Sequence, residues 1–260
     1  ICGSDQIWNP NCQDFDEAYL LAFVKDKTKC IDYAPSVASH YINPQYHSLF
    51  RKQLKDFEFL SVREKSGAAV ISEIIGREPT VVLDPVFLLN ADKWRELIAA
   101  SPVKQKYIFC YFIGDVVGMR HFARKMHKAT GLPLVVVYKN IRDQLYRNIK
   151  MYSAGPVEFL SLIAHAEYIC TNSFHAVAFS VIFMKNFWVF VDYANIHSSK
   201  SRIFDFTEMI GLENRVLSAG DRGIEFDDPI DFAPAMKIIA QEREKSMEYL
   251  AKALYEGAGY

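Results

Sequence analysis

The chain has 260 residues, half of them hydrophobic, so it can bury a substantial core and is long enough for about two domains of ordinary size. Its formal net charge of −1 argues against a nucleic-acid-binding protein, whose binding face usually needs a basic excess. No uninterrupted apolar stretch reaches the roughly 18 residues of a membrane span, so we expect no transmembrane segment and leave peripheral association with a membrane open.

The first ninety residues alternate between strand and helix patterns. The opening "ICGSDQ" resembles the end of a buried strand, and because the chain begins at Ile1 instead of Met, we expect that sequence upstream is missing. The further predicted elements are a strand within 28–36, a helix over 43–57, a strand over 58–64, a helix over 63–76 and a strand over 80–89. This alternation indicates a parallel sheet with covering helices.

A second series follows a polar stretch at 91–106, where we place a domain junction between residues 1–103 and residues 104–260. Its predicted elements are strands over 106–114, 132–138, 167–172 and 186–191, and helices over 118–131, 155–166, 175–184 and 234–260. The predicted fold class is therefore α/β, with two Rossmann-like domains built on parallel sheets and the amino-terminal domain incomplete.

The five cysteines show no CxxC or Cys/His metal spacing, and we expect no metal site. We also expect no cofactor. Cys110 and Cys170 lie within apolar runs, where a free cysteine behaves as a small hydrophobic residue. Their odd number and core placement favour a reducing compartment, and we expect a cytoplasmic protein. Fingerprints of classical dinucleotide, P-loop, zinc protease and serine hydrolase sites are absent.

Polar side chains follow three strands of the amino-terminal half, where an open α/β sheet binds its ligands. Asp5 could accept a proton or a sugar hydroxyl, although a helix cap explains it equally well. Arg63 suits a carboxylate or phosphate, but taken alone a surface pair with Glu64 is the more common arrangement. Asp84 could act as a base, and its place before Pro85 favours a turn cap.

The segment "ICTNSFHAVAFSVIF" (169–183) places a polar turn and a histidine between two apolar runs. We expect Asn172 and Ser173 to lie in the turn, Ser173 to cap the following helix, and His175 to lie in its first turn. Free N–H groups and the dipole of a helix start favour an anion there. The alternative is a core histidine bonded to a backbone carbonyl. Arg202, in the charged segment 198–202, could supply a cation for the same anion or lie in a solvated loop.

Several of these segments together resemble the polysaccharide pyruvyl transferase family. They occur in the family's order and span nearly the whole chain. They are "GSDQIWN" (3–9), "SVRE" (61–64), "LDPVFLL" (83–89), "EFLSLIAHAEYICTNSFHAVAFSVIF" (158–183) and "SSKSRIFDFTEMIGLENRVL" (198–217).

The resemblance implies a fold similar to the GT-B glycosyltransferases, with two Rossmann-like domains facing a cleft. It also implies transfer of a pyruvyl group from phosphoenolpyruvate to a sugar hydroxyl pair, which forms a ketal on a saccharide or lipid-linked saccharide precursor. The matching positions are Asp5, Arg63, Asp84 and His175. Many members carry an arginine where this chain has Ser173, so we expect Arg202 or Arg63 to replace that cation.

Two other functions remain open at this point. One is a GT-B-type glycosyltransferase that uses a nucleotide sugar. The other is a non-catalytic carbohydrate-binding protein with a degenerate site, which the serine in place of the arginine favours. Binding of phosphoenolpyruvate, of a nucleotide sugar or of a saccharide alone would distinguish the three, because each ligand stabilises the protein that binds it.

Overall fold

The computed structural model describes residues 1–11, 15–114, 118–137, 150–191, 201–218, 226 and 228–257. It divides the chain into two compact units, each described here by itself. Unit 1 comprises Ile1–Leu88, Asn195–Ile210 and Lys237–Tyr260, and unit 2 comprises Leu89–Ala194 and Gly211–Met236.

Unit 2 begins at Leu89, so the position predicted for the junction, near residue 103, lies within unit 2, and the chain later returns to unit 1 twice. Ser161 of unit 2 bonds both backbone groups of Ala99, which fixes the polar stretch to its own unit. Ser246, near the end of the chain, accepts a hydrogen bond from the backbone of Leu83 at 2.9 Å and so belongs with unit 1. A linear pattern of strands and helices gives no sign of such returns.

Unit 1 is built on four short parallel strands. These are β1 (Cys2–Gly3), β2 (Asp32–Tyr33), β3 (Ser61–Val62) and β4 (Thr80–Val81), with helices α1 (His47–Leu54), α2 (Lys65–Ile75), α7 (Ser201–Met209) and α8 (Ala233–Gly257) from Lys237 onward. Strands β1 and β2 pair, β3 and β4 pair, and a parallel bridge between Ile31 and Phe59 joins the pairs. All four carboxyl ends therefore lie at one edge.

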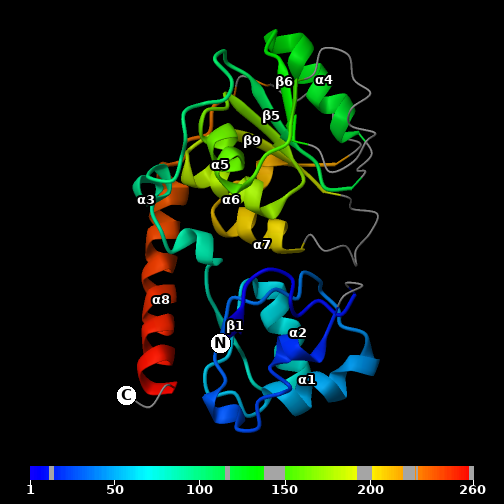
Figure 1. The fold of residues 1–260 in the computed structure, drawn as a ribbon. Coiled ribbons are helices and arrows are strands. Elements are labelled where there is room, and N and C mark those ends of the chain that lie inside the picture. The colour runs from blue at the N-terminus through cyan, green and yellow to red at the C-terminus, as the bar shows by residue number, and fades with distance from the viewer. Residues whose placement is uncertain are drawn as a thin grey trace. The chain divides into compact units, whose positions relative to one another are not determined.

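The core of unit 1 lies on both sides of these strands. Helices α1 and α2 cover one side with side chains that include Phe50 and Ile71. Helix α8 covers the other, where Ala253 and Tyr249 pack against Ile31 and neighbouring residues (Figure 1). The predicted helices over 43–57 and 63–76 are confirmed, and α2 ends at Gly76 in the left-handed conformation, as expected.

Gly3 allows β1 to approach β2. A Cβ atom at this position would lie 1.9 Å from the carbonyl oxygen of Tyr33, which no side chain tolerates. The next two residues, Ser4 and Asp5, both have positive φ angles of 59° and 38°. Left-handed backbone at non-glycine residues is costly and concentrates at functional turns, so the chain turns sharply at the end of β1 and presents Asp5 there.

Strand β2 carries a fully buried carboxyl group, Asp32. Its Oδ1 accepts hydrogen bonds from the backbone N–H and the hydroxyl of Ser61 at 2.7 and 2.6 Å. Among the residues that the structure describes, no donor reaches Oδ2. Burial raises the pKa of Asp32 to about 8, and the bonds from Ser61 offset only part of this shift. Asp32 is therefore largely protonated in the folded protein at neutral pH.

This buried acid predicts that stability depends on pH. Asp32 ionises near pH 4 in an unfolded chain and near pH 8 in the folded one, so folding takes up a proton between these values. The contribution of Asp32 is complete below about pH 4 and is lost as the pH rises to about 8, by up to about 1.4 kcal/mol per pH unit. Urea unfolding at several pH values should show this fall.

Asp32→Asn should remove this dependence, because the amide does not titrate. The exposed carboxylate of Asp56 offers a matched control, and Asp56→Asn should keep the slope of the wild type. Equal slopes in the wild type and in Asp32→Asn would contradict the assignment of the proton to Asp32.

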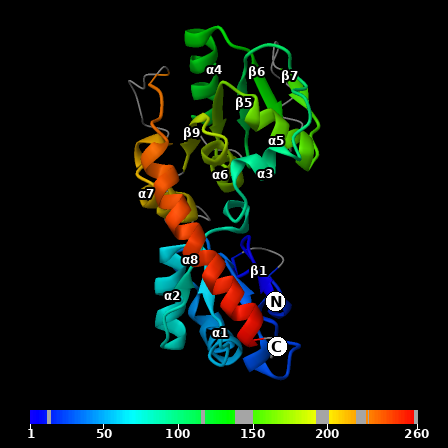
Figure 2. The ribbon, with the colours of Figure 1, turned by 90° about the vertical axis from the view of Figure 1, so that its left-hand side faces the viewer.

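Unit 2 holds a six-stranded parallel sheet in the order β10-β9-β8-β5-β6-β7. Its strands are β5 (Ile108–Tyr111), β6 (Leu134–Val137), β7 (Lys150–Tyr152), β8 (Tyr168–Thr171), β9 (Asn186–Phe190) and β10 (Val216–Leu217), and its helices are α3 (Ala91–Arg95), α4 (Met119–Thr130), α5 (Pro156–Ala164) and α6 (Phe174–Ile182). Figure 2 shows α4 on one side of the strands and α5 on the other. This is the doubly wound arrangement, with a switch in strand order between β5 and β8.

The sequence patterns explain the elements of unit 2 well. Helix α4 buries Phe122 and Met126 against the sheet and ends at Gly131, as predicted. Pro156 opens α5, where a missing N–H is harmless. Nearly every side chain of α6 is buried, which is why its sequence is apolar on all faces. Among the described residues, every helix is too short or too polar to cross a membrane.

Candidate functional site

Charged and polar side chains gather at the carboxyl ends of the strands of unit 1. We call this group the arginine cluster. It consists of Asp5, Gln6, Arg63, Glu64, Asp84 and Arg202.

Arg63 forms a buried ion pair with Asp84. Its Nη1 donates to Oδ2 of Asp84, and the two side chains are 2% and 1% exposed. The other oxygen of Asp84 accepts from the backbone N–H of Val86 at 3.1 Å. The interpretation of Asp84 as a turn cap is therefore confirmed, and the same carboxylate also neutralises Arg63.

Glu64 holds the loop that follows β2. Its Oε1 accepts from the hydroxyl of Ser36 and from the backbone N–H of Ala38, both at 2.9 Å, and Oε2 lies 3.7 Å from Nε of Arg63. The expected surface pair of Arg63 and Glu64 is wrong in one respect, since both side chains are buried. Burial raises the pKa of Glu64, although the charge of Arg63 opposes this shift.

Arg202 enters the cluster from helix α7. Its Nη1 lies 3.8 Å from Oδ1 of Asp5. When the side-chain amide of Gln6 is oriented with its oxygen toward Arg202, that oxygen accepts hydrogen bonds from Nη1 and Nη2 of Arg202, both at 2.8 Å. Arg202 is the second residue of α7, so the predicted alternative of a solvated loop is wrong for this residue. Residues 198–200 of the same charged segment lie outside the described residues.

The two guanidinium groups lie within electrostatic reach of each other. Burial, and then the positive charge of Arg63, lower the pKa of Arg202 to about 10. The carboxylates of Asp5, Glu64 and Asp84 oppose this shift, and Arg202 remains charged at neutral pH. Asp5 differs from the buried members of the cluster, because its side chain is 70% exposed. Asp5 thus presents a solvent-facing carboxylate beside the more deeply placed arginines.

The turn that carries His175 lies in unit 2, at the end of β8. Ser173 is the N-cap of α6 and accepts from the N–H of Ala176 at 3.5 Å, as predicted. His175 is half-buried in the first turn of that helix, and its ring meets the ring of Phe174 edge-on at 5.6 Å. The predicted position of this histidine in the fold is confirmed.

Asn172 joins the ends of two neighbouring strands. Its Oδ1 accepts from the backbone N–H of Ile113, and its Nδ2 donates to the carbonyl of the same residue, both at 2.7 Å. Thr171 adds a bond to the carbonyl of Tyr111 at 2.6 Å. These contacts tie β8 to the segment after β5, where the strand order switches and where doubly wound sheets bind ligands.

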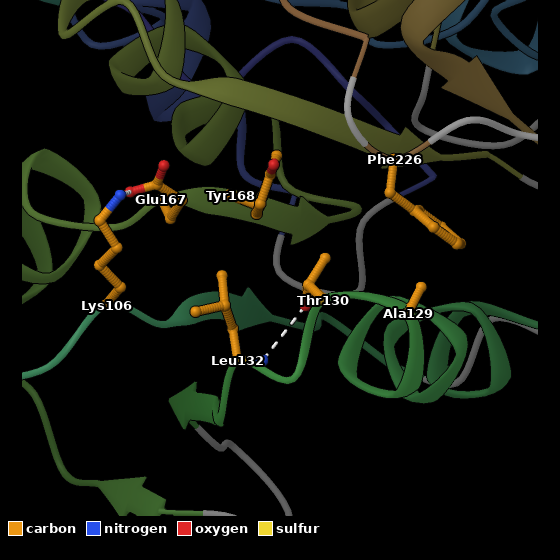
Figure 3. Close-up of a pocket in the computed structure, with 7 residues that line it drawn as sticks. All are labelled: Lys106, Ala129, Thr130, Leu132, Glu167, Tyr168 and Phe226. Carbon is orange, nitrogen blue, oxygen red and sulfur yellow. Dashed lines mark hydrogen bonds and ion pairs between the residues drawn. The ribbon is translucent and has the colours of Figure 1, made fainter.

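A separate cavity of about 440 Å³ lies elsewhere in unit 2 (Figure 3). Lys106 and Glu167 form an ion pair at its rim at 3.2 Å. These two residues precede β5 and β8, whereas His175 follows β8. Since the strands are parallel, the cavity lies at the opposite edge of the sheet from His175.

The structure thus groups the predicted site residues in two places. Asp5, Arg63, Asp84 and Arg202 lie together in unit 1. The residues of the turn, Asn172, Ser173 and His175, lie together in unit 2. Within the described parts of the chain, no three His, Cys, Asp or Glu side chains are placed to hold a metal ion.

Sequence reasoning missed two members of the cluster. Gln6 adjoins Asp5 in the first polar turn, and this adjacency is the signal that could have included it. Glu64 looked like a surface partner of Arg63, because sequence does not show that the loop after β2 folds over it and buries it.

A search of curated proteins found no match. Among solved structures, Arabidopsis thaliana UGT89C1 complexed with quercetin aligns at 10% identity over 93% of this chain and 70% of its own, with a TM-score of 0.46. The wall teichoic acid polymerase TagF soaked with CDPG aligns at 10% identity over 81% of this chain and 62% of its own, with a TM-score of 0.38. The polysaccharide pyruvyl transferase family model matches residues 1–195. With three quarters of its length matched, the chain belongs to the polysaccharide pyruvyl transferase family.

Proposed function

We propose that this protein transfers a pyruvyl group from phosphoenolpyruvate to a pair of hydroxyls on a saccharide or lipid-linked saccharide, forming a ketal on a polysaccharide precursor. The observation that carries the proposal is a pair of arginines in a member of this family: Arg63 is buried after β3, and Arg202 on α7 reaches the same cluster. We also propose that the protein has the GT-B-like fold that membership of this family implies.

The donor suits the arginine cluster. Phosphoenolpyruvate carries a phosphate and a carboxylate, and guanidinium groups bind both with paired, charge-assisted hydrogen bonds. Many family members carry an arginine at the position of Ser173. In this chain we assign the missing positive charge to Arg202, which Gln6 and Asp5 orient.

The reaction needs two proton movements. Two C–O bonds form at C2 of the donor, the C–O bond to phosphate breaks, and the methylene carbon takes up a proton to become a methyl group. The acceptor hydroxyls release two protons in total. One is balanced by the proton that the methylene carbon takes up, and the other leaves with inorganic phosphate. We assign donor contact or protonation to His175, and acceptor binding or proton removal to the exposed Asp5, since such groups are suited to general acid–base work.

The test is an assay with the purified protein, phosphoenolpyruvate and a panel of oligosaccharide acceptors. The proposal predicts release of inorganic phosphate that depends on the acceptor, together with a product whose mass has increased by one pyruvyl ketal. Consumption of a nucleotide sugar, with no phosphate release from phosphoenolpyruvate, would favour a glycosyltransferase instead. Saccharide binding without turnover of either donor would favour a carbohydrate-binding protein.

A further inference from the structure

We infer that Asp205 is a positioning residue, which docks helix α7 on the start of helix α2 and thereby holds Arg202 in the arginine cluster. The inference rests on the proposed function, because it gives Asp205 a role in binding the anionic donor. Asp205 itself is not a member of the cluster.

One of the contacts that dock the helix is a hydrogen bond between distant segments. Oδ2 of Asp205 accepts from the backbone N–H of Ser66 at 2.8 Å. Ser66 lies in the first turn of α2, whose N-cap residue, Glu64, makes no capping bond with its side chain. Helix starts leave their first N–H groups without internal partners and attract negative charge. Asp205 therefore supplies the cap that the chain of α2 lacks.

This bond links the two arginines through short, rigid paths. Arg63 precedes Ser66 by three residues, and Arg202 precedes Asp205 by three residues on α7. Residues three apart on a helix share a face. Arg63 and Arg202 lie more than a hundred residues apart in the chain. The bond between Ser66 and Asp205 joins the two segments that carry them and so helps to set the distance between the two guanidinium groups.

An apolar contact secures the same helix but does not fix its rotation. The ring of Phe206 packs against the ring of Phe87 with centroids 5.0 Å apart. Apolar packing is non-directional, whereas the bond to Ser66 has a defined geometry. The bonds from Arg202 to Gln6 orient its guanidinium group, and the bond from Ser66 to Asp205 adds a directional contact that holds the helix itself. Helix α7 also lies beyond residues 1–195, which the family model matches.

The experiment measures binding of phosphoenolpyruvate, and separately of inorganic phosphate, by calorimetry. Asp205→Ala is expected to weaken binding of phosphoenolpyruvate about tenfold, on the scale of a lost charged hydrogen bond. Asp205→Asn keeps an oxygen that can accept from Ser66 and is expected to stay within about threefold of the wild type. Glu208→Ala removes an exposed carboxylate of the same helix and is the matched control, with no expected change.

A double variant tests whether Asp205 acts through Arg202. If it does, Arg202→Ala combined with Asp205→Ala binds no more weakly than Arg202→Ala alone. Additive losses, or wild-type binding by Asp205→Ala, would overturn the inference. A wild type that binds neither anion would overturn both the inference and the anion site. A wild type that binds phosphoenolpyruvate but transfers no pyruvyl group would refute the proposed reaction, while the variants would still decide the role of Asp205.

Discussion

Replacement of Arg63 by methionine is expected to lower the free energy of unfolding by about 3–5 kcal/mol and to abolish binding of phosphoenolpyruvate. The loss of stability follows from the partners that remain. Asp84 and Glu64 are both buried beside Arg63, and without the guanidinium group they become negative charges in a medium of low polarity. Removing one partner of a buried pair is costly for this reason.

The measurement is urea unfolding followed by calorimetry with the donor. Arg95→Met is a matched control, because Arg95 pairs with Asp92 on an exposed helix surface and its loss should change stability by less than about 0.5 kcal/mol. Arg63→Lys keeps the charge but not the planar fork, so it should restore part of the stability and little of the binding. Unfolding of Arg63→Met at the same urea concentration as the wild type would show that the pair is not a structural element.

Replacement of His175 by alanine is expected to lower kcat for pyruvyl transfer by about 100-fold to 10,000-fold, the range of a lost general acid or base. Folding should be affected little, because the imidazole is only half-buried and Ser173 still caps the helix. The readout is the rate of phosphate release under saturating donor, with thermal stability measured in parallel.

His121→Ala provides the control for this prediction, since His121 lies exposed on helix α4. It should transfer pyruvyl groups at the rate of the wild type. Full activity of a correctly folded His175→Ala variant would remove the histidine from the mechanism, even though its position at the start of α6 is established.

The sequence predicted the elements that have a strong period or a clear boundary signal. Gly76 and Gly131 end helices where expected, and Pro156 opens one. The sequence also predicts the cap at Ser173, because a small polar residue between an apolar strand and an apolar helix is typical of an N-cap. These features depend on neighbours in the chain, so a single sequence contains them.

Contacts between segments that are distant in the chain could not be predicted from the sequence in the same way. Helix α7 joins unit 1 through the bond from Ser66 to Asp205, which lies 139 positions away along the chain. Periodicity along the chain does not indicate such a return, so the sequence predicts a single domain junction. The burial of Glu64 has the same origin, because a loop from another part of the chain covers it.

A crystal structure of the protein with phosphoenolpyruvate bound would test directly whether the arginine cluster binds the donor. We expect the phosphate or the carboxylate of the donor to lie within hydrogen-bond distance of Arg63 and Arg202, at the carboxyl ends of β1 to β4. A donor bound instead in the cavity beside Lys106 and Glu167, with the arginine cluster free of any anion, would contradict this expectation.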